Sequence, residues 1–173
     1  MVTPGDGRND SKDTCADTCA VAAGCDFGFG ALCVRIALLH GEKADLCDQL
    51  EAIADSLPNC VDRWTCLDVA ERLEALFRLA HRFEEDVLFP AFVEGGQRAA
   101  RLATIDRLKL EHVHDESAAA EIAEELQRIG NGGAISNPEA LGFMLRAFFD
   151  TVRRHMAFER EHMFPPEWMQ PVR

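Results

Sequence analysis

The sequence contains no tyrosine, so a mechanism that needs a tyrosine ligand or a tyrosyl radical is excluded. It also lacks an apolar run near the ~20 residues that a membrane-spanning helix needs. The longest apolar stretch near the N-terminus, residues 28–40, is interrupted by Arg35 and follows an acidic, polar segment, which does not fit a secretory signal peptide. We therefore expect a cytoplasmic protein with no membrane partner.

Positive charge is scarce. The 173 residues include 18 Lys and Arg against 30 Asp and Glu, a formal net charge of -12. This balance argues against nucleic acid as a partner, because phosphate backbones bind basic surfaces. Hydrophobic residues make up 47% of the chain, enough for the core of one domain. The seven cysteines are an odd number and, without a secretory signal, we expect them to be reduced thiols.

No segment alternates with a period of two, so no strand is predicted. Residues 1–27 lack a hydrophobic period and are predicted to form a flexible leader that carries Cys15, Cys19 and Cys25. Residues 28–173 show helical periodicity in four segments with short connections, which predicts an all-α, antiparallel up-down-up-down four-helix bundle. The predicted helices span residues 30–57, 65–93, 97–129 and 137–164.

Four of the six histidines lie on apolar stripes, one in each predicted helix: His40, His81, His112 and His155. Each buried imidazole needs a hydrogen-bond partner, so packing alone is a poor explanation for four of them. Counting about 1.5 Å per residue from the predicted helix ends places all four near one level of the bundle. The histidines therefore predict a cluster in the core.

Two carboxylates join this cluster. Glu85 follows His81 by four residues and Glu159 follows His155 by four, which puts each pair on one helix face. Imidazole nitrogens with carboxylate oxygens suit iron, manganese or zinc, and carboxylates in an apolar interior need cations to neutralise them. We expect two metal ions on six ligands: His40, His81, Glu85, His112, His155 and Glu159. His162 is either a further ligand or a polar residue at the rim.

These motifs resemble those of the hemerythrin-like family, also called the HHE cation-binding domain. Residues 81–90 read HRFEEDVLFP, residues 155–165 read HMAFEREHMFP, and Glu111 precedes His112. The resemblance covers residues 30–168 and implies a non-haem di-iron centre. It further implies that the chain binds dioxygen or nitric oxide, or senses redox or iron status. No nucleophile–base pair can be read, so no catalytic residue is assigned.

One spacing departs from the family pattern. The step from histidine to proline is nine residues in the second motif, between His81 and Pro90, but ten in the fourth. Aligned from the Phe-Pro end, Glu84 takes the carboxylate position instead of Glu85. We favour Glu85, since its spacing from His81 matches that of the fourth motif, and keep Glu84 as the alternative. A true slip would weaken the second metal position.

Three other interpretations stay open. Glu111-x-x-His114 and Glu159-x-x-His162 match the Glu-x-x-His pattern of ferritin-like di-iron carboxylate oxidases, but His114 lies off the apolar stripe. The leader cysteines could form a sensor, although their spacing fits no zinc or iron–sulfur motif. The chain could also be a metal-free helical interaction module, whose melting temperature a chelator would not change.

Overall fold

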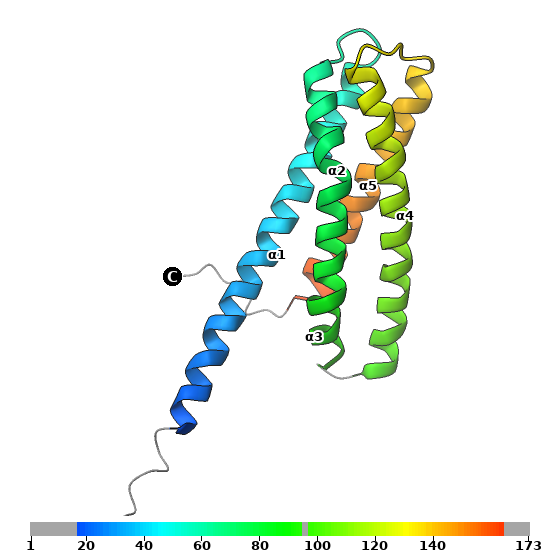
Figure 1. Ribbon diagram of the computed structural model, residues 1–173. Coiled ribbons are helices and arrows are strands. Elements are labelled where there is room, and N and C mark those ends of the chain that lie inside the picture. Colours follow the sequence, from blue (N-terminus) through cyan, green and yellow to red (C-terminus); the bar gives the residue numbers. More distant parts are fainter. Residues whose placement is uncertain (1–16, 95–96, 165–173) are drawn as a thin grey trace, which may run out of the picture. The chain divides into compact units, whose positions relative to one another are not determined.

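All regular structure in the described part of the chain is helical, which confirms the all-α class. The computed structural model describes residues 17–94 and 97–164, with side chains from residues 34–93 and 97–164. Four helices are long, and a π-helical turn with a short helix follows the second of them (Figure 1). In chain order the elements are α1 (Asp17–Ser56), α2 (Arg63–Phe83), η1 (Glu84–Leu88), α3 (Phe89–Glu94), α4 (Arg98–Gly130) and α5 (Pro138–His162).

The helix ends follow local chemistry. The Asp62 side chain accepts a hydrogen bond from the backbone N–H of Trp64 at 3.0 Å, which caps the N-terminus of α2. Asn137 caps α5 in the same way through the N–H of Ala140, also at 3.0 Å. Pro138 is then the first helical residue, where its missing N–H costs nothing. The predicted start of the last helix at these residues is confirmed.

Glycine is required where α4 ends. A Cβ atom on Gly130 would lie 2.5 Å from the Leu67 Cγ atom and 3.0 Å from the Arg63 carbonyl oxygen. The absence of a side chain therefore lets the end of α4 approach the start of α2. Gly132, with a φ of +97°, then turns the chain through a conformation that other residues rarely adopt.

The second predicted helix, residues 65–93, is not continuous. The π-helical turn η1 interrupts it, and the N–H of Phe89 bonds back to the Glu84 carbonyl five residues earlier. Pro90 gives the physical reason, because proline lacks an N–H and its ring would clash with the carbonyl four residues before it. A wider turn directly before Pro90 relieves that clash.

The first helix also differs from its prediction, since α1 begins at Asp17 rather than near residue 30. Residues 1–16 of the predicted leader lie outside the described residues and residues 17–27 belong to α1, so the flexibility of the leader stays a prediction. The chain divides into two compact units at the Ala37–Leu38 boundary, and each is considered by itself.

The hydrophobic core belongs to the unit that starts at Leu38. Helices α1, α2, α4 and α5 each contribute fully buried side chains at three- and four-residue steps, as the apolar stripes predicted. Its members include Leu46, Leu50, Leu73, Phe77, Ile122, Leu126, Leu145 and Phe148. None of the described helices has the length and apolar character needed to cross a bilayer.

Candidate metal centre

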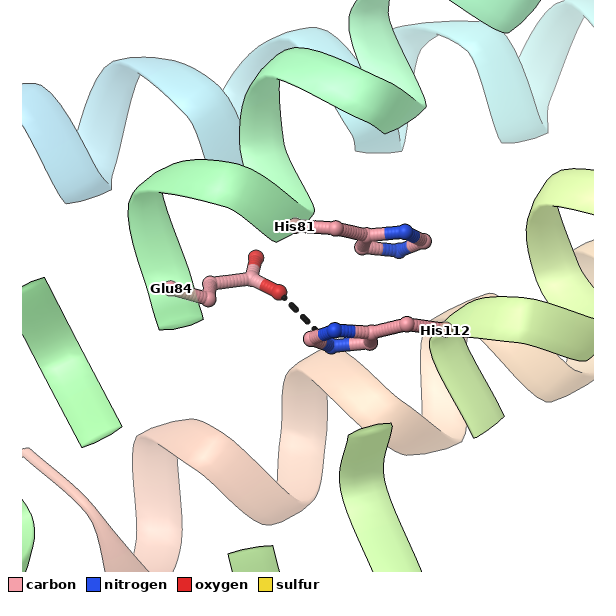
Figure 2. A group of neighbouring side chains, drawn as sticks. All are labelled: His81, Glu84 and His112. Atoms are coloured by element: carbon pink, nitrogen blue, oxygen red, sulfur yellow. Dashed lines mark ion pairs between the residues drawn. The ribbon is translucent and has the colours of Figure 1, made fainter. Parts of the chain in front are cut away.

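Three histidines from three helices meet in the core. His81 on α2 and His112 on α4 stack face to face, with ring centroids 3.9 Å apart and planes within 3° (Figure 2). His155 on α5 lies 5.1 Å from His112 and 6.5 Å from His81, centroid to centroid. All three are at most 5% exposed. The clustering predicted from helix length is thus present in the structure.

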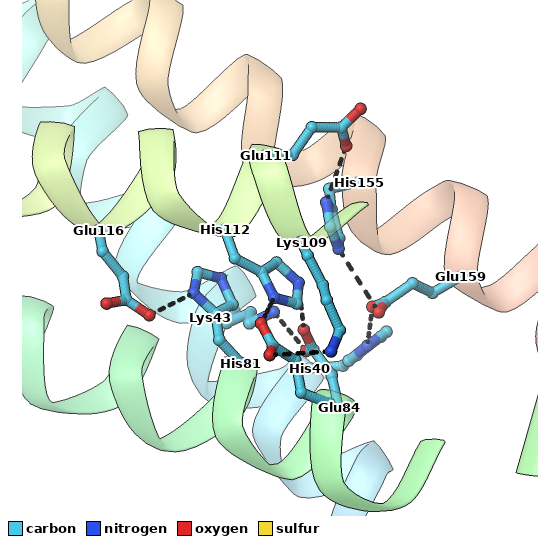
Figure 3. Close-up of polar contacts among 11 residues, drawn as sticks. His40, Lys43, His81, Glu84, Lys109, Glu111, His112, Glu116, His155 and Glu159 are labelled. Carbon is cyan, nitrogen blue, oxygen red and sulfur yellow. Dashed lines mark hydrogen bonds and ion pairs between the residues drawn. The ribbon is translucent and has the colours of Figure 1, made fainter. Parts of the chain in front are cut away.

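Glu159 connects the fourth histidine to this group. Its Oε2 atom lies 3.0 Å from the Nε2 atom of His40, which comes from α1. Its Oε1 atom lies 3.5 Å from the Nε2 atom of His155, one helical turn earlier on α5. Glu159 is fully buried, so its carboxylate lies between two imidazoles with no access to water (Figure 3).

The structure places Glu84, and not Glu85, inside the cluster. Glu84 is 2% exposed, and its Oε2 atom lies 3.1 Å from the Nε2 atom of His112. The Glu85 side chain is 33% exposed and lies on the outer side of the same ring, 2.9 Å from Nδ1 of His112 and 3.5 Å from the Lys109 ammonium. The ligand role of Glu85 stays a prediction, while its neighbour occupies the interior position.

Two sets of side chains could hold a metal ion, judged by ligand atoms that all lie within 4.8 Å of one another. One set is His81, Glu84 and His112; the other is His40, Glu84 and Glu159. All five residues are buried, and Glu84 belongs to both sets. The centre therefore offers two neighbouring cation positions that share one carboxylate.

Partly exposed carboxylates hold the outer edges of three imidazole rings. The Nδ1 atoms of His81, His112 and His155 lie 3.0, 2.9 and 3.2 Å from Glu116, Glu85 and Glu111. Ionised carboxylates can only accept hydrogen bonds, so each Nδ1 carries the proton. A ring that carries its single proton on Nδ1 turns the lone pair of its Nε2 atom inward, which is the form in which histidine binds metals.

Several buried polar atoms in the interior have no hydrogen-bond partner. They are His40 Nδ1, Glu84 Oε2, His112 Nε2, His155 Nε2 and Glu159 Oε1. The last four form two facing pairs, each an imidazole nitrogen close to a carboxylate oxygen. Two acceptors repel unless a cation or a proton lies between them. This donor set therefore fits a transition metal.

Electrostatics keep His81 and Glu84 in metal-binding form, whereas Glu159 outweighs the effect of burial on His155 and raises the pKa of that ring. Burial, assisted by His112 and Lys43, lowers the pKa of His81 to about 2, so this ring is neutral at physiological pH. Burial acts to raise the pKa of Glu84, but Lys43 and His112 outweigh it and the pKa is lowered. The Glu84 carboxylate is therefore ionised.

Lys43 is a member of the centre that the sequence analysis missed. It is 1% exposed, and its Nζ atom lies 2.6 Å from Glu84 Oε1 (Figure 3). Burial acts to lower its pKa, but Glu84 and Glu159 raise it overall, so the ammonium is charged. The signal was present, because the predicted apolar stripe steps from Leu39 to Leu46 and Lys43 fills the gap.

The remaining candidates lie away from the centre. His114 and His162 are exposed, and His162 Nδ1 interacts with the Phe158 carbonyl on its own helix. Cys47 is buried, and burial raises its pKa to about 11, so it is a neutral thiol at physiological pH. The side chains of the leader cysteines Cys15, Cys19 and Cys25 lie outside the described part of the chain.

Comparison with known proteins gives one match. The model of the hemerythrin HHE cation-binding domain matches residues 35–166, about three quarters of the chain. This range contains every histidine and carboxylate of the centre. No curated protein and no solved structure matches.

Proposed function

Because the chain belongs to the hemerythrin HHE cation-binding domain family, we propose that its centre binds non-haem iron. The observation that carries this proposal is the pair of buried contacts in which an imidazole nitrogen without a hydrogen-bond partner faces a carboxylate oxygen. These contacts join His112 to Glu84 and His155 to Glu159. Such pairs are costly in an apolar interior without a cation.

The side chains of the proposed centre come from all four long helices and from η1: His40, His81, Glu84, His112, His155 and Glu159. Glu84 replaces Glu85 in this set because it is buried and belongs to both candidate groups. Glu85, Glu111 and Glu116 orient the rings from outside. The antiparallel order of the helices is part of the proposal and is supported by the short connections between them. The cytoplasmic location stays a prediction from the sequence.

We propose dioxygen or nitric oxide as the small ligand. Ferrous iron with mostly neutral imidazole ligands can keep an open coordination position for such a molecule. Apolar side chains limit water access to that position: the Phe89 ring stacks on His112 with centroids 5.4 Å apart, and Leu88 beside it is 1% exposed. A surface cavity of about 300 Å³ is lined by Phe89 and Glu85, two residues that also contact His112.

The ferritin-like interpretation is less well supported. It needs Glu111 and His114 as ligands on α4, but His114 is exposed and Glu111 bonds to Arg107 and His155 outside both candidate groups. Glu111→Ala separates the two proposals. The ferritin-like proposal expects metal to be lost, whereas ours expects it to be retained with lower affinity.

The test of iron binding is metal analysis of the full chain after anaerobic reconstitution with ferrous iron. We expect iron to co-purify with the protein through a desalting column and a chelator to lower the melting temperature. Addition of nitric oxide to the reduced protein should produce an iron–nitrosyl absorption spectrum. A protein that binds no iron, and whose melting temperature a chelator does not change, would instead be a metal-free interaction module.

A further inference from the structure

The centre already contains one buried cation, the Lys43 ammonium group. Lysine is almost never fully buried unless it is paired, and here the pairing partner is Glu84. The Nζ atom also lies 5.9 Å from the centroid of the Phe77 ring. Since Lys43 is only 1% exposed, its charge is balanced by the carboxylates of the centre, Glu84 first and Glu159 next.

The two oxygens of Glu84 have different roles. Oε1 accepts a hydrogen bond from Lys43 at 2.6 Å, whereas Oε2 has no hydrogen-bond partner and faces His112 Nε2 at 3.1 Å. A carboxylate that bridges two metal ions gives one oxygen to each. The Lys43 ammonium group therefore competes with a second metal ion for Oε1, while Oε2 stays available for one metal ion on the side of His112.

The balance of buried charges also favours a single metal ion. Two carboxylates of the centre are buried close to Lys43, namely Glu84 and Glu159. Lys43 and one divalent ion together already carry three positive charges against these two carboxylates. A second divalent ion would add two more positive charges to a buried region, which is unfavourable.

We propose that the Lys43 ammonium group takes the place of a second metal ion, so that this chain binds one divalent ion, at His81, Glu84 and His112. The proposal rests on the proposed function, that the centre binds metal at all. The proposed number of metal ions, one per chain, differs from the two iron ions predicted from the sequence. Three protein ligands leave further coordination positions open for water or a small ligand.

The first experiment compares wild type with Lys43→Met and Lys43→Leu, which place an apolar side chain on the apolar stripe of α1. Lys109→Met is the matched control, because Lys109 also contacts a glutamate of η1 but is 47% exposed. Each protein is reconstituted anaerobically with ferrous iron, desalted, and analysed for iron per chain. After oxidation in air, electron paramagnetic resonance distinguishes isolated ferric iron, which gives a high-spin signal, from a coupled pair, which is silent.

We expect one isolated iron per chain in wild type and in the Lys109 variant, and a coupled pair in the Lys43 variants. Two coupled irons in wild type would overturn the inference and leave the proposed function intact, whether or not the Lys43 variants fold. Folded Lys43 variants that still bind one iron would also overturn it. No iron in any protein would instead refute the proposed function, and the inference with it.

The position of the single ion has its own test. His81→Gln removes a ligand of the proposed ion. His40→Gln removes a member of the other candidate set, which consists of His40, Glu84 and Glu159. We expect the His81 variant to lose iron and the His40 variant to keep it, with circular dichroism as the control for folding. The opposite result would overturn the assignment of the ion to the His81 side.

Discussion

At the scale of single residues, Glu84 and Glu85 are adjacent in the sequence but occupy opposite sides of the His112 ring. Glu84 reaches Nε2 from the interior and Glu85 reaches Nδ1 from the partly exposed side. A rule based on i to i+4 spacing selects Glu85, because it assumes a regular α-helix. The exposed fraction of the two side chains, 3% for Glu84 against 33% for Glu85, decides which of them is placed to bind a metal.

We predict that Glu84→Gln and Glu85→Gln have different effects on metal affinity. Glu84→Gln removes an interior anionic oxygen and should abolish retention of iron. Glu85→Gln removes an outer partner of His112, which typically costs about 10–100-fold in affinity. Competition against a chromophoric chelator measures both. Loss of iron from the Glu85 variant together with retention by the Glu84 variant would contradict the assignment of Glu84 as the interior ligand. If the Glu84 variant does not fold, retention of iron by the Glu85 variant still tests the role of Glu85.

At the scale of helices, the apolar stripes predicted the elements and the residues that face the core. The histidines of α2, α4 and α5 could be placed at one level because helix rise is constant. The π-helical turn η1 could not be predicted in the same way, although its cause, Pro90, is visible in the sequence. A proline can end, kink or widen a helix, and tertiary packing decides among these outcomes.

Lys43 illustrates a second limit of sequence patterns. A lysine on an apolar stripe predicts an interruption, because its charge is costly to bury. In the structure the charge is buried, since Glu84 lies 2.6 Å away on a different helix. The partner is 41 residues distant in the sequence. Only the assembled helices reveal that the pair forms.

Two helical glycines provide a prediction at this scale. Gly130→Ala should lower the free energy of unfolding by about 1–3 kcal/mol, because its methyl group would overlap with Leu67. Gly41→Ala is the matched control within α1, where an added Cβ has no neighbour within 4 Å. It should raise that free energy by about 0.5–1 kcal/mol through helix propensity. Urea denaturation measures both, and equal effects would contradict the close approach of α4 to α2.

At the scale of the whole molecule, the buried charges link metal binding to stability. The described core consists of an apolar cluster and, next to it, the charged side chains of the metal centre. The folded state therefore needs positive charge near Glu84 and Glu159. Lys43 supplies one such charge before any metal binds. We therefore expect the chelated wild-type protein to stay folded and to gain stability when metal is added, by about 2.7 kcal/mol at a free metal concentration 100 times the Kd.

The last prediction compares this behaviour with that of Lys43→Met. Without metal, the variant leaves the Glu84 carboxylate buried without its cation, and breaking a buried pair typically costs about 3–5 kcal/mol. Saturating metal should narrow that deficit, because an ion can then bind where the ammonium group stood. Urea unfolding measures the free energy of unfolding of wild type and Lys43→Met, each with chelator and with metal. The control Lys109→Met is expected to have the same free energies of unfolding as wild type. If the deficit of Lys43→Met is the same with and without metal, the ammonium group and the metal ion do not substitute for one another, and Lys43 serves packing alone.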